Sequence, residues 1–107
     1  ANEVLYAGRR LKADEALRWG LVNAVVPADR LLDEARALAA RIMASAPLAV
    51  EAVIAVDRTT RSLPLDEAFA HLRSGELDAY ERMLASEDAE EGPRAFTEGR
   101  DPHWQGR

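Results

Sequence analysis

The segment PLAVEAVIAV, residues 47–56, places the strongest constraint on the fold. Pro47 suits the first position of a helix, and the residues that follow it are apolar on nearly every helical face. Such a helix has to be covered on several sides, because each fully buried Val, Leu or Ile contributes about 1.5–3 kcal/mol relative to its exposed state. We therefore expect other elements to pack against this helix from more than one direction.

Amphipathic stretches elsewhere in the chain predict a mainly α fold with at most one short strand. Apolar residues at helical spacing indicate helices over the ranges 1–7, 13–19, 30–45 and 65–85. Gly8 and Gly20 follow the first two, at the position where helices commonly turn left-handed. Gly75 interrupts the longest one at a cost of about 1 kcal/mol relative to alanine, so we interpret it as a site of close backbone approach.

One short strand is predicted at residues 21–26, LVNAVV, because the segment is rich in β-branched residues and is closed by Pro27. No other segment alternates with a period of two, so this strand has no partner within the sequence. A lone strand leaves its N–H and C=O groups unpaired, which is costly when they are buried. The missing partner is a first indication that the chain is part of a larger fold.

The segment SEDAEEGPRAF, residues 86–96, predicts a short acidic helix followed by a second short helix. Ser86 is a typical N-cap, and the acids after it suit the positive end of a helix. We expect Gly92 to close this helix and Pro93 to open the next one, which carries Phe96. The spacing of a calcium-binding loop is absent, so we interpret the acids as helix-capping charge and predict no metal site.

Charge and composition exclude several classes of function. The net charge of −5 argues against general nucleic-acid binding, which depends on Lys and Arg neutralising phosphates. Because the chain has no cysteine, disulfides, thiolate metal sites and cysteine nucleophiles are excluded. No apolar run approaches the ~20 residues that a membrane span needs, and no signal-peptide pattern is present. We therefore expect a cytoplasmic protein without nucleic-acid or membrane partners.

Motifs that carry chemistry are absent from the sequence. The nucleophile elbow G-x-S-x-G, the P-loop and the G-x-G-x-x-G turn do not occur. His71 and His103 are far apart without a ligand-like spacing, and Trp19 and Trp104 are typical packing anchors. The residues by themselves therefore assign no catalytic group and no metal ligand.

Three tracts of the sequence, taken in order, carry a family pattern. GRRLKADEALRWGLVNAVVPADRLLDEARALAARI, residues 8–42, follows the pattern G-R-x-[IL]-x-A-x-E-A-x-x-x-G-L-V-x-x-V-V-P. APLAVEAVIAVDRTTRSLPLDEAFAHL, residues 46–72, follows an S-x-P-x-A helix with a long helix behind it. ASEDAEEGPRAFTEGRDPHWQG, residues 85–106, follows S-x-D-x-x-E-G-x-x-A-F-x-E-K-R-x-P-x-[FW]-x-G. Together they cover essentially the whole chain, which thus resembles the enoyl-CoA hydratase/isomerase (crotonase) superfamily.

The resemblance implies that the chain is the C-terminal part of a longer enzyme. In this family an N-terminal spiral of β-sheet and helices supplies backbone N–H donors, as an oxyanion hole, and the acid/base carboxylates. Residues 1–28 would be the end of that core, with short helices and one strand, and residues 29–107 a helical assembly and lid region. Family members assemble as trimers or hexamers, so the resemblance also implies self-association.

The resemblance further implies a coenzyme A contact at the end of the chain. In family hydratases the Phe of the closing motif and a Lys near it help to hold CoA, and Phe96 matches that Phe. The Lys position is Gly99 here, so Arg100 or Arg94 would have to meet the phosphates, which guanidinium groups bind in a bidentate manner. The alternative from the residues alone is that Phe96 plugs the domain core.

The sequence therefore predicts a segment of an acyl-CoA enzyme, most simply of the enoyl-CoA hydratase/isomerase type, a lyase of fatty acid metabolism. Acyl-CoA would be its substrate, with no tightly bound cofactor, and residues 1–107 alone would be inactive. The alternative is a free-standing helical oligomerisation module without catalysis. The reaction and the acyl chain stay open, because one fold carries hydration, isomerisation, hydrolysis and decarboxylation in this family.

Overall fold

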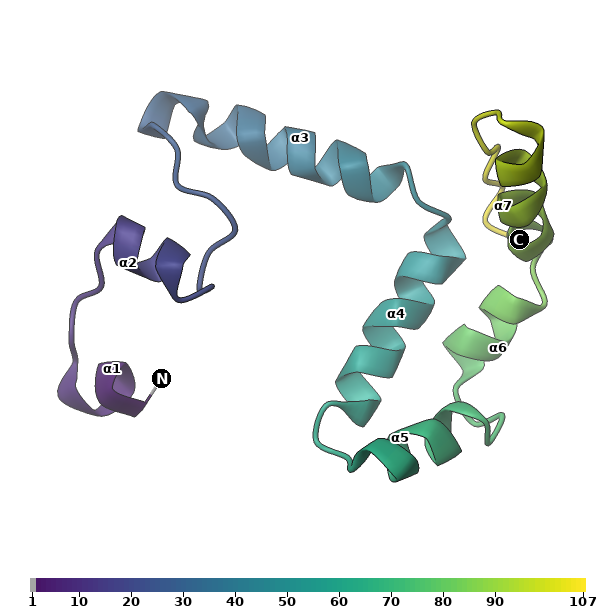
Figure 1. Ribbon diagram of the computed structural model, residues 1–107, viewed down its shortest axis with the longest axis horizontal. Coiled ribbons are helices and arrows are strands. Elements are labelled where there is room, and N and C mark those ends of the chain that lie inside the picture. The colour runs from purple at the N-terminus through teal and green to yellow at the C-terminus, as the bar shows by residue number, and fades with distance from the viewer. Residues whose placement is uncertain (1) are drawn as a thin grey trace. The chain divides into compact units, whose positions relative to one another are not determined.

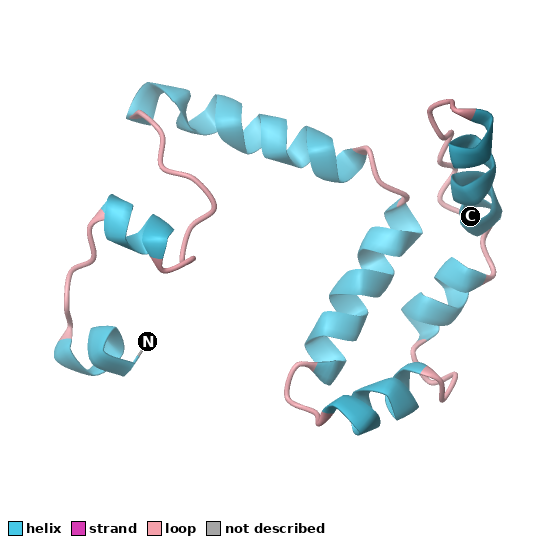
Figure 2. Cartoon of the chain, in the orientation of Figure 1, coloured by secondary structure: helices cyan, strands magenta, loops and turns pink. Residues whose placement is uncertain are grey.

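The computed structural model describes residues 2–107, in which every regular element is a helix (Figures 1 and 2). In chain order the elements are α1 (Asn2–Ala7), α2 (Ala13–Arg18), the 3-10 turn η1 (Ala28–Arg30), α3 (Leu31–Met43), α4 (Pro47–Thr60), α5 (Leu65–Leu72), α6 (Asp78–Leu84) and α7 (Glu87–Glu98). The predicted mainly α fold is confirmed, and these residues contain no strand.

The chain divides into two compact units, Ala1–Ala37 and Leu38–Arg107, and the boundary between them falls inside α3. The division that the family resemblance places between residues 28 and 29 stays a prediction. Each unit is described by itself below.

In the first unit, both short helices end as their glycines predict. Gly8 and Gly20 have φ angles of 60° and 70°, in the left-handed region that glycine adopts without steric cost. Between the helices, the Arg9 guanidinium donates to Glu15 Oε1 at 2.7 Å and lies over the ring of Trp19, 5.3 Å from its centroid. Arg9 thus contacts both Glu15 and Trp19, and its Nε also lies 3.9 Å from Glu3 Oε1.

The strand predicted at residues 21–26 is not formed. Residues 21–23 bend, and residues 24–27 have no regular structure. A strand is stabilised by a hydrogen-bonded neighbour, and the part of the chain that the structure describes contains no second strand to pair with it. The segment instead leaves apolar side chains such as Leu21 and Val22 exposed.

The second unit is organised around the apolar helix α4. α6 lies beside it (Figure 1), and the contact buries Ala52 to 2% exposure while an Arg82–Glu51 ion pair at 2.5 Å closes the edge. α5 also contacts α4. On the remaining surface Val53 is 68% exposed and Ile54 is exposed as well. The cover expected from several directions is therefore supplied in part only.

The single helix predicted at residues 65–85 is two helices, α5 and α6. The chain leaves the helical conformation after Leu72, and Gly75 has a φ of 76°, which an L side chain rarely adopts. A Cβ at Gly75 would meet no atom within 4 Å, so the predicted close backbone approach is wrong. Glycine is favoured there because the turn between α5 and α6 requires a positive φ.

Large apolar side chains remain exposed in both units. No large side chain in residues 3–107 is fully buried, whereas Leu5, Trp19, Met43, Val53 and Leu65 are each exposed. No single helix within residues 2–107 is long and apolar enough to cross a membrane. Residues 28–43 and 47–60 reach that length only when joined, and the chain bends sharply between them.

We predict that residues 1–107 self-associate at micromolar concentration, because exposed apolar surface beyond a few hundred Å² seeks partners. Sedimentation velocity over a concentration series measures this directly. Val53→Glu should reduce the association by placing a charge on the uncovered face of α4, and Glu81→Gln on α6 serves as the polar control. A monomer at every concentration would contradict the prediction.

Candidate functional site

The last helix, α7, starts where the sequence predicts. The Ser86 hydroxyl oxygen accepts the backbone N–H of Ala89 at 3.1 Å, which satisfies one of the unpaired donors of the first turn. Acidic residues occupy that turn, where the partial positive charge of the helix end stabilises carboxylates. The N-cap is confirmed.

α7 runs through Gly92 and Pro93 to Glu98, so the predicted break at Gly92 is wrong. Gly92 does not adopt a positive φ, and the left-handed turn that ends the helix comes at Gly99. A Cβ at Gly92 would lie 3.4 Å from the Trp104 ring, which is ordinary van der Waals contact, so the indole packs against the helix at this position. The helix tolerates the lost N–H of Pro93.

The end of α7 is a Schellman motif. Gly99 has φ 67° and ψ 31°, its N–H donates to the Phe96 carbonyl at 3.3 Å, and the Arg100 N–H donates to the Ala95 carbonyl at 3.1 Å. A lysine at Gly99, as in the family pattern, would have to adopt the left-handed conformation at a cost of about 1–2 kcal/mol. Glycine therefore suits the left-handed position that ends α7.

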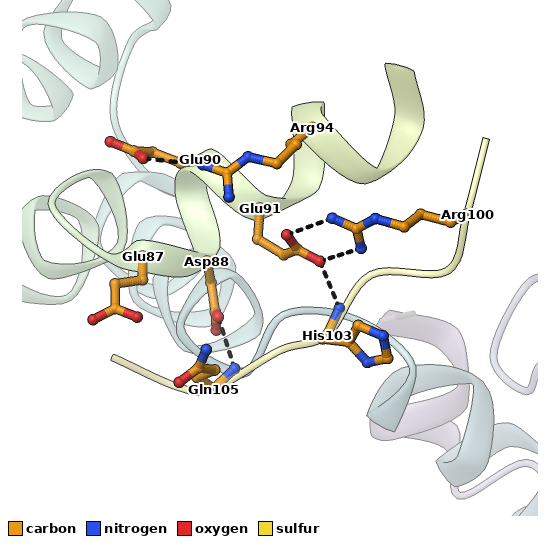
Figure 3. A pocket seen from close by; sticks show the side chains of 8 residues that line it. All are labelled: Glu87, Asp88, Glu90, Glu91, Arg94, Arg100, His103 and Gln105. Atoms are coloured by element: carbon orange, nitrogen blue, oxygen red, sulfur yellow. Dashed lines mark hydrogen bonds and ion pairs between the residues drawn. The ribbon is translucent and has the colours of Figure 1, made fainter. Parts of the chain in front are cut away.

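Beyond Gly99 the chain turns back along α7, and the buried carboxylate of Asp88 receives it. Asp88 is 4% exposed, and one of its oxygens accepts the backbone N–H of Gln105 at 2.7 Å (Figure 3). The other accepts the backbone N–H of Gly106 at 2.8 Å. A buried carboxylate is stable only when its oxygens are hydrogen-bonded, and here both are. Asp88 is therefore an anchor for residues 99–107, which we call the tail.

Glu91, one turn along the same face, is the second anchor. Its Oε1 and Oε2 accept the Arg100 Nη1 and Nη2 groups at 2.6 and 2.9 Å, and Oε1 also accepts the backbone N–H of His103 at 2.8 Å (Figure 3). The Arg100 hydrogen bond and then the His103 N–H lower the pKa of Glu91 from 4.5 to about 2, and the two carboxylates beside Arg100 raise its pKa.

Trp104, within the tail, attaches it to a second part of the unit. Its indole N–H donates to the carbonyl of Ala44 at 2.8 Å, in the turn after α3, while its ring covers Gly92. One half-buried tryptophan thus joins the tail, α7 and the residues that precede α4.

A cavity of about 300 Å³ lies between α7 and the tail (Figure 3). Its lining residues are Glu87, Asp88, Glu90, Glu91, Arg94, Arg100, His103 and Gln105. Four carboxylates face two guanidinium groups, so the cavity disfavours a phosphate ligand. Within residues 2–107, no three His, Asp or Glu side chains converge as a metal site.

The structure places the predicted site residues on α7 and just after its end, where Arg94 and Arg100 line the cavity and Phe96 does not. Phe96 is 89% exposed, so the alternative of a core plug is wrong for this chain. Arg94 is exposed and pairs with Glu90 at 3.6 Å, whereas Arg100 is bonded to Glu91 and Glu98. Arg94 is therefore the cation more available to an outside anion.

Sequence reasoning missed the anchoring role of Asp88 and Glu91. The acids of residues 86–96 suit helix capping, and Asp88 does lie in the first turn, but Asp88 and Glu91 also accept hydrogen bonds from the tail. Their spacing of three places them on one helical face, and that spacing was the available signal.

The comparisons with known proteins agree on one family. The family model for enoyl-CoA hydratase/isomerase matches residues 1–107. Carnitinyl-CoA dehydratases of Citrobacter koseri and Escherichia coli K12 are 52% and 53% identical over 106 residues, which are 99% of this chain and 41% of theirs. The chain thus spans well under half the length of these relatives.

Solved structures show the same likeness. An enoyl-CoA hydratase from Bacillus anthracis matches with a TM-score of 0.84 and 33% identity, over 99% of this chain and 40% of that one. An enoyl-CoA hydratase/isomerase from Mycobacterium paratuberculosis matches with a TM-score of 0.81 and 39% identity, over 94% of this chain and 38% of that one.

We predict an acid-dependent loss of stability that depends on Glu91. The pKa of Glu91 is lower in the folded chain than in the unfolded chain. The contribution of Glu91 to the stability of the fold is therefore complete above pH 4.5 and is lost as the pH falls toward about 2. Melting temperatures of the wild type and Glu91→Gln should therefore differ near neutral pH and converge in acid.

Glu90→Gln removes the same charge from the same helix, but Glu90 has only the exposed Arg94 as its partner. We expect this control to melt close to the wild type at every pH. Equal melting temperatures for the wild type and Glu91→Gln near neutral pH would refute the anchoring role of Glu91.

Proposed function

Because the chain belongs to the enoyl-CoA hydratase/isomerase (crotonase) family, we propose that it is a C-terminal segment of an acyl-CoA enzyme. The observation that carries the proposal is the family match over residues 1–107, together with coverage of only 41% of the relatives. The exposed apolar face of α4 supports it, since a larger protein would cover that face. We assign the oxyanion donors and acid/base groups to the remaining part of that protein.

The reaction we propose is elimination or addition of water across the Cα–Cβ bond of an acyl-CoA, with the thioester left intact. The two relatives at 52% and 53% identity are named dehydratases of carnitinyl-CoA, which favours this reaction over double-bond isomerisation. In such chemistry the thioester carbonyl is polarised by fixed N–H donors where negative charge develops, and carboxylates transfer the protons. Acyl-CoA is the substrate, and no tightly bound cofactor is needed.

In the longer protein, residues 1–107 would contribute oligomer contacts and one side of the CoA site. Phe96 is a suitable contact for the adenine ring, because an aromatic side chain exposed to this degree on α7 has no role in the core. Arg94, exposed one turn earlier on α7, is the cation we assign to a phosphate, in preference to Arg100. The uncovered apolar surface supports self-association, and the family resemblance suggests a trimer or hexamer.

The second candidate is a free-standing helical oligomerisation module without catalysis. The exposed apolar side chains in both units favour it, since an assembly of copies would bury them as well. The length and content of the natural polypeptide separate the two candidates.

We predict that the longer protein containing this chain hydrates crotonyl-CoA and dehydrates carnitinyl-CoA, and that residues 1–107 alone do neither. In the active protein, Phe96→Ala should raise KM by about 5–150-fold through loss of aromatic stacking. Steady-state kinetics followed by enoyl-thioester absorbance provide the measurement. Phe69→Ala, which removes a half-exposed ring from α5, is the matched control and should leave KM unchanged.

Turnover by residues 1–107 alone would overturn the assignment of the catalytic groups to another segment. A natural polypeptide that ends with this segment but catalyses neither reaction would favour the oligomerisation module. An unchanged KM in Phe96→Ala would withdraw the CoA contact from α7.

A further inference from the structure

Arg100 has little capacity left for an outside ligand. Its Nε donates to Glu98 Oε2 at 2.5 Å, Nη1 to Glu91 Oε1 at 2.6 Å and to the Asp101 carbonyl at 3.1 Å, and Nη2 to Glu91 Oε2 at 2.9 Å. Every nitrogen of the guanidinium therefore already donates to an oxygen of the protein. A phosphate would have to displace a bidentate carboxylate from a position beside other carboxylates.

The ion pair between Glu91 and Arg100 spans the last turns of α7 and links their two ends, and we call this pair the bracket. The Arg100 backbone N–H bonds the Ala95 carbonyl, and its side chain returns to Glu91, one turn before Ala95. Glu91 is the more enclosed partner, with 15% of its side chain exposed, and it also receives the N–H of His103. The turn that carries Phe96 is thus held by two contacts of Arg100, one with Ala95 and one with Glu91, and Glu91 is itself held by the tail.

Phe96 depends on this bracket because nothing else holds it. With 89% of the residue exposed, packing contributes almost nothing to its position, which is set by the backbone of the last turn. Helix ends fray unless their carbonyls are capped, and this cap consists of Gly99 and Arg100.

We infer that Glu91 and Arg100 are positioning residues that hold the last turn of α7, and hence Phe96, in the orientation that meets coenzyme A, and that Arg100 is not a phosphate ligand. The inference rests on the proposed CoA contact of Phe96. The two roles of Arg100 predict opposite effects when Glu91 is neutralised. A phosphate ligand released from Glu91 binds CoA more tightly, whereas a bracket without Glu91 loosens and binds it more weakly.

The test compares Glu91→Gln, Arg100→Gln and their double variant in the longer enzyme. Glu87→Gln, which makes the same charge change on the same helix beside the exposed Arg107, is the control. We expect Glu91→Gln and Arg100→Gln each to raise KM for the acyl-CoA about tenfold with kcat unchanged, the scale of a lost charge-assisted hydrogen bond. The double variant should be no worse than either single one, because the two residues act as a unit. A lower KM in Glu91→Gln would overturn the inference.

Arg100→Lys adds a second discrimination. Lysine retains the charge that would attract phosphate but cannot make the bidentate contact with Glu91, so we expect it to resemble Arg100→Gln. Retention of the wild-type KM in Arg100→Lys would favour the phosphate role.

Amide hydrogen exchange of Gly99 and Arg100, measured without CoA, separates this inference from the proposed function. Both amides should exchange about tenfold faster in Glu91→Gln than in the wild type or Glu90→Gln, since their acceptors lie in the turn that the bracket holds. If Phe96→Ala leaves KM unchanged while exchange accelerates as expected, the CoA contact fails and the bracket stands. Unchanged exchange in Glu91→Gln refutes the bracket itself.

Discussion

The docking of the tail onto two carboxylates of α7 is the interaction on which the C-terminal unit depends. Asp88 and Glu91 accept backbone N–H groups of Gln105, Gly106 and His103, so a segment without regular structure has its polar backbone satisfied by side chains. With the tail in place, Trp104 can reach Gly92 and the turn after α3. The acidic character of this helix is thus explained by backbone donors as well as by the helix dipole.

Uncovered apolar surface is the second constraint. Tail docking stabilises the second unit through its own contacts, whereas exposed apolar side chains call for contacts with other protein surface. α4 is apolar on most of its faces, yet the described part of the chain buries mainly the side that meets α6. A polypeptide with this much uncovered apolar surface is stabilised by further contacts, and the relatives, which are more than twice as long, have the length to provide them. Three observations therefore fit the proposal that the chain is a segment of a longer protein: family membership, the unformed strand and the exposed helix face.

The sequence predicted the helices and their caps well because those signals are local. Ser86, Gly8 and Gly20 each act within a few residues, and the structure confirms them. The predictions failed at two glycines and at the strand. Gly75 carries the left-handed turn that divides residues 65–85 into α5 and α6, whereas Gly92 stays helical and the turn comes at Gly99. The segment at 21–26 lacks the neighbouring strand that its composition requires, since residues 2–107 contain none. The exposure of Phe96 was likewise not predictable from local sequence, because it depends on which other segments pack against α7.

The most direct test of tail docking is the pattern of amide hydrogen exchange along the tail. Within residues 99–107, all of which the structure describes, the N–H groups of His103, Gln105 and Gly106 donate to α7 carboxylates, whereas those of Asp101 and Trp104 have no acceptor. We predict slow exchange at the first three and fast exchange at the other two, an alternation that general disorder or general burial cannot produce. Uniformly fast exchange from residue 101 to residue 106 would contradict the docking of the tail on Asp88 and Glu91.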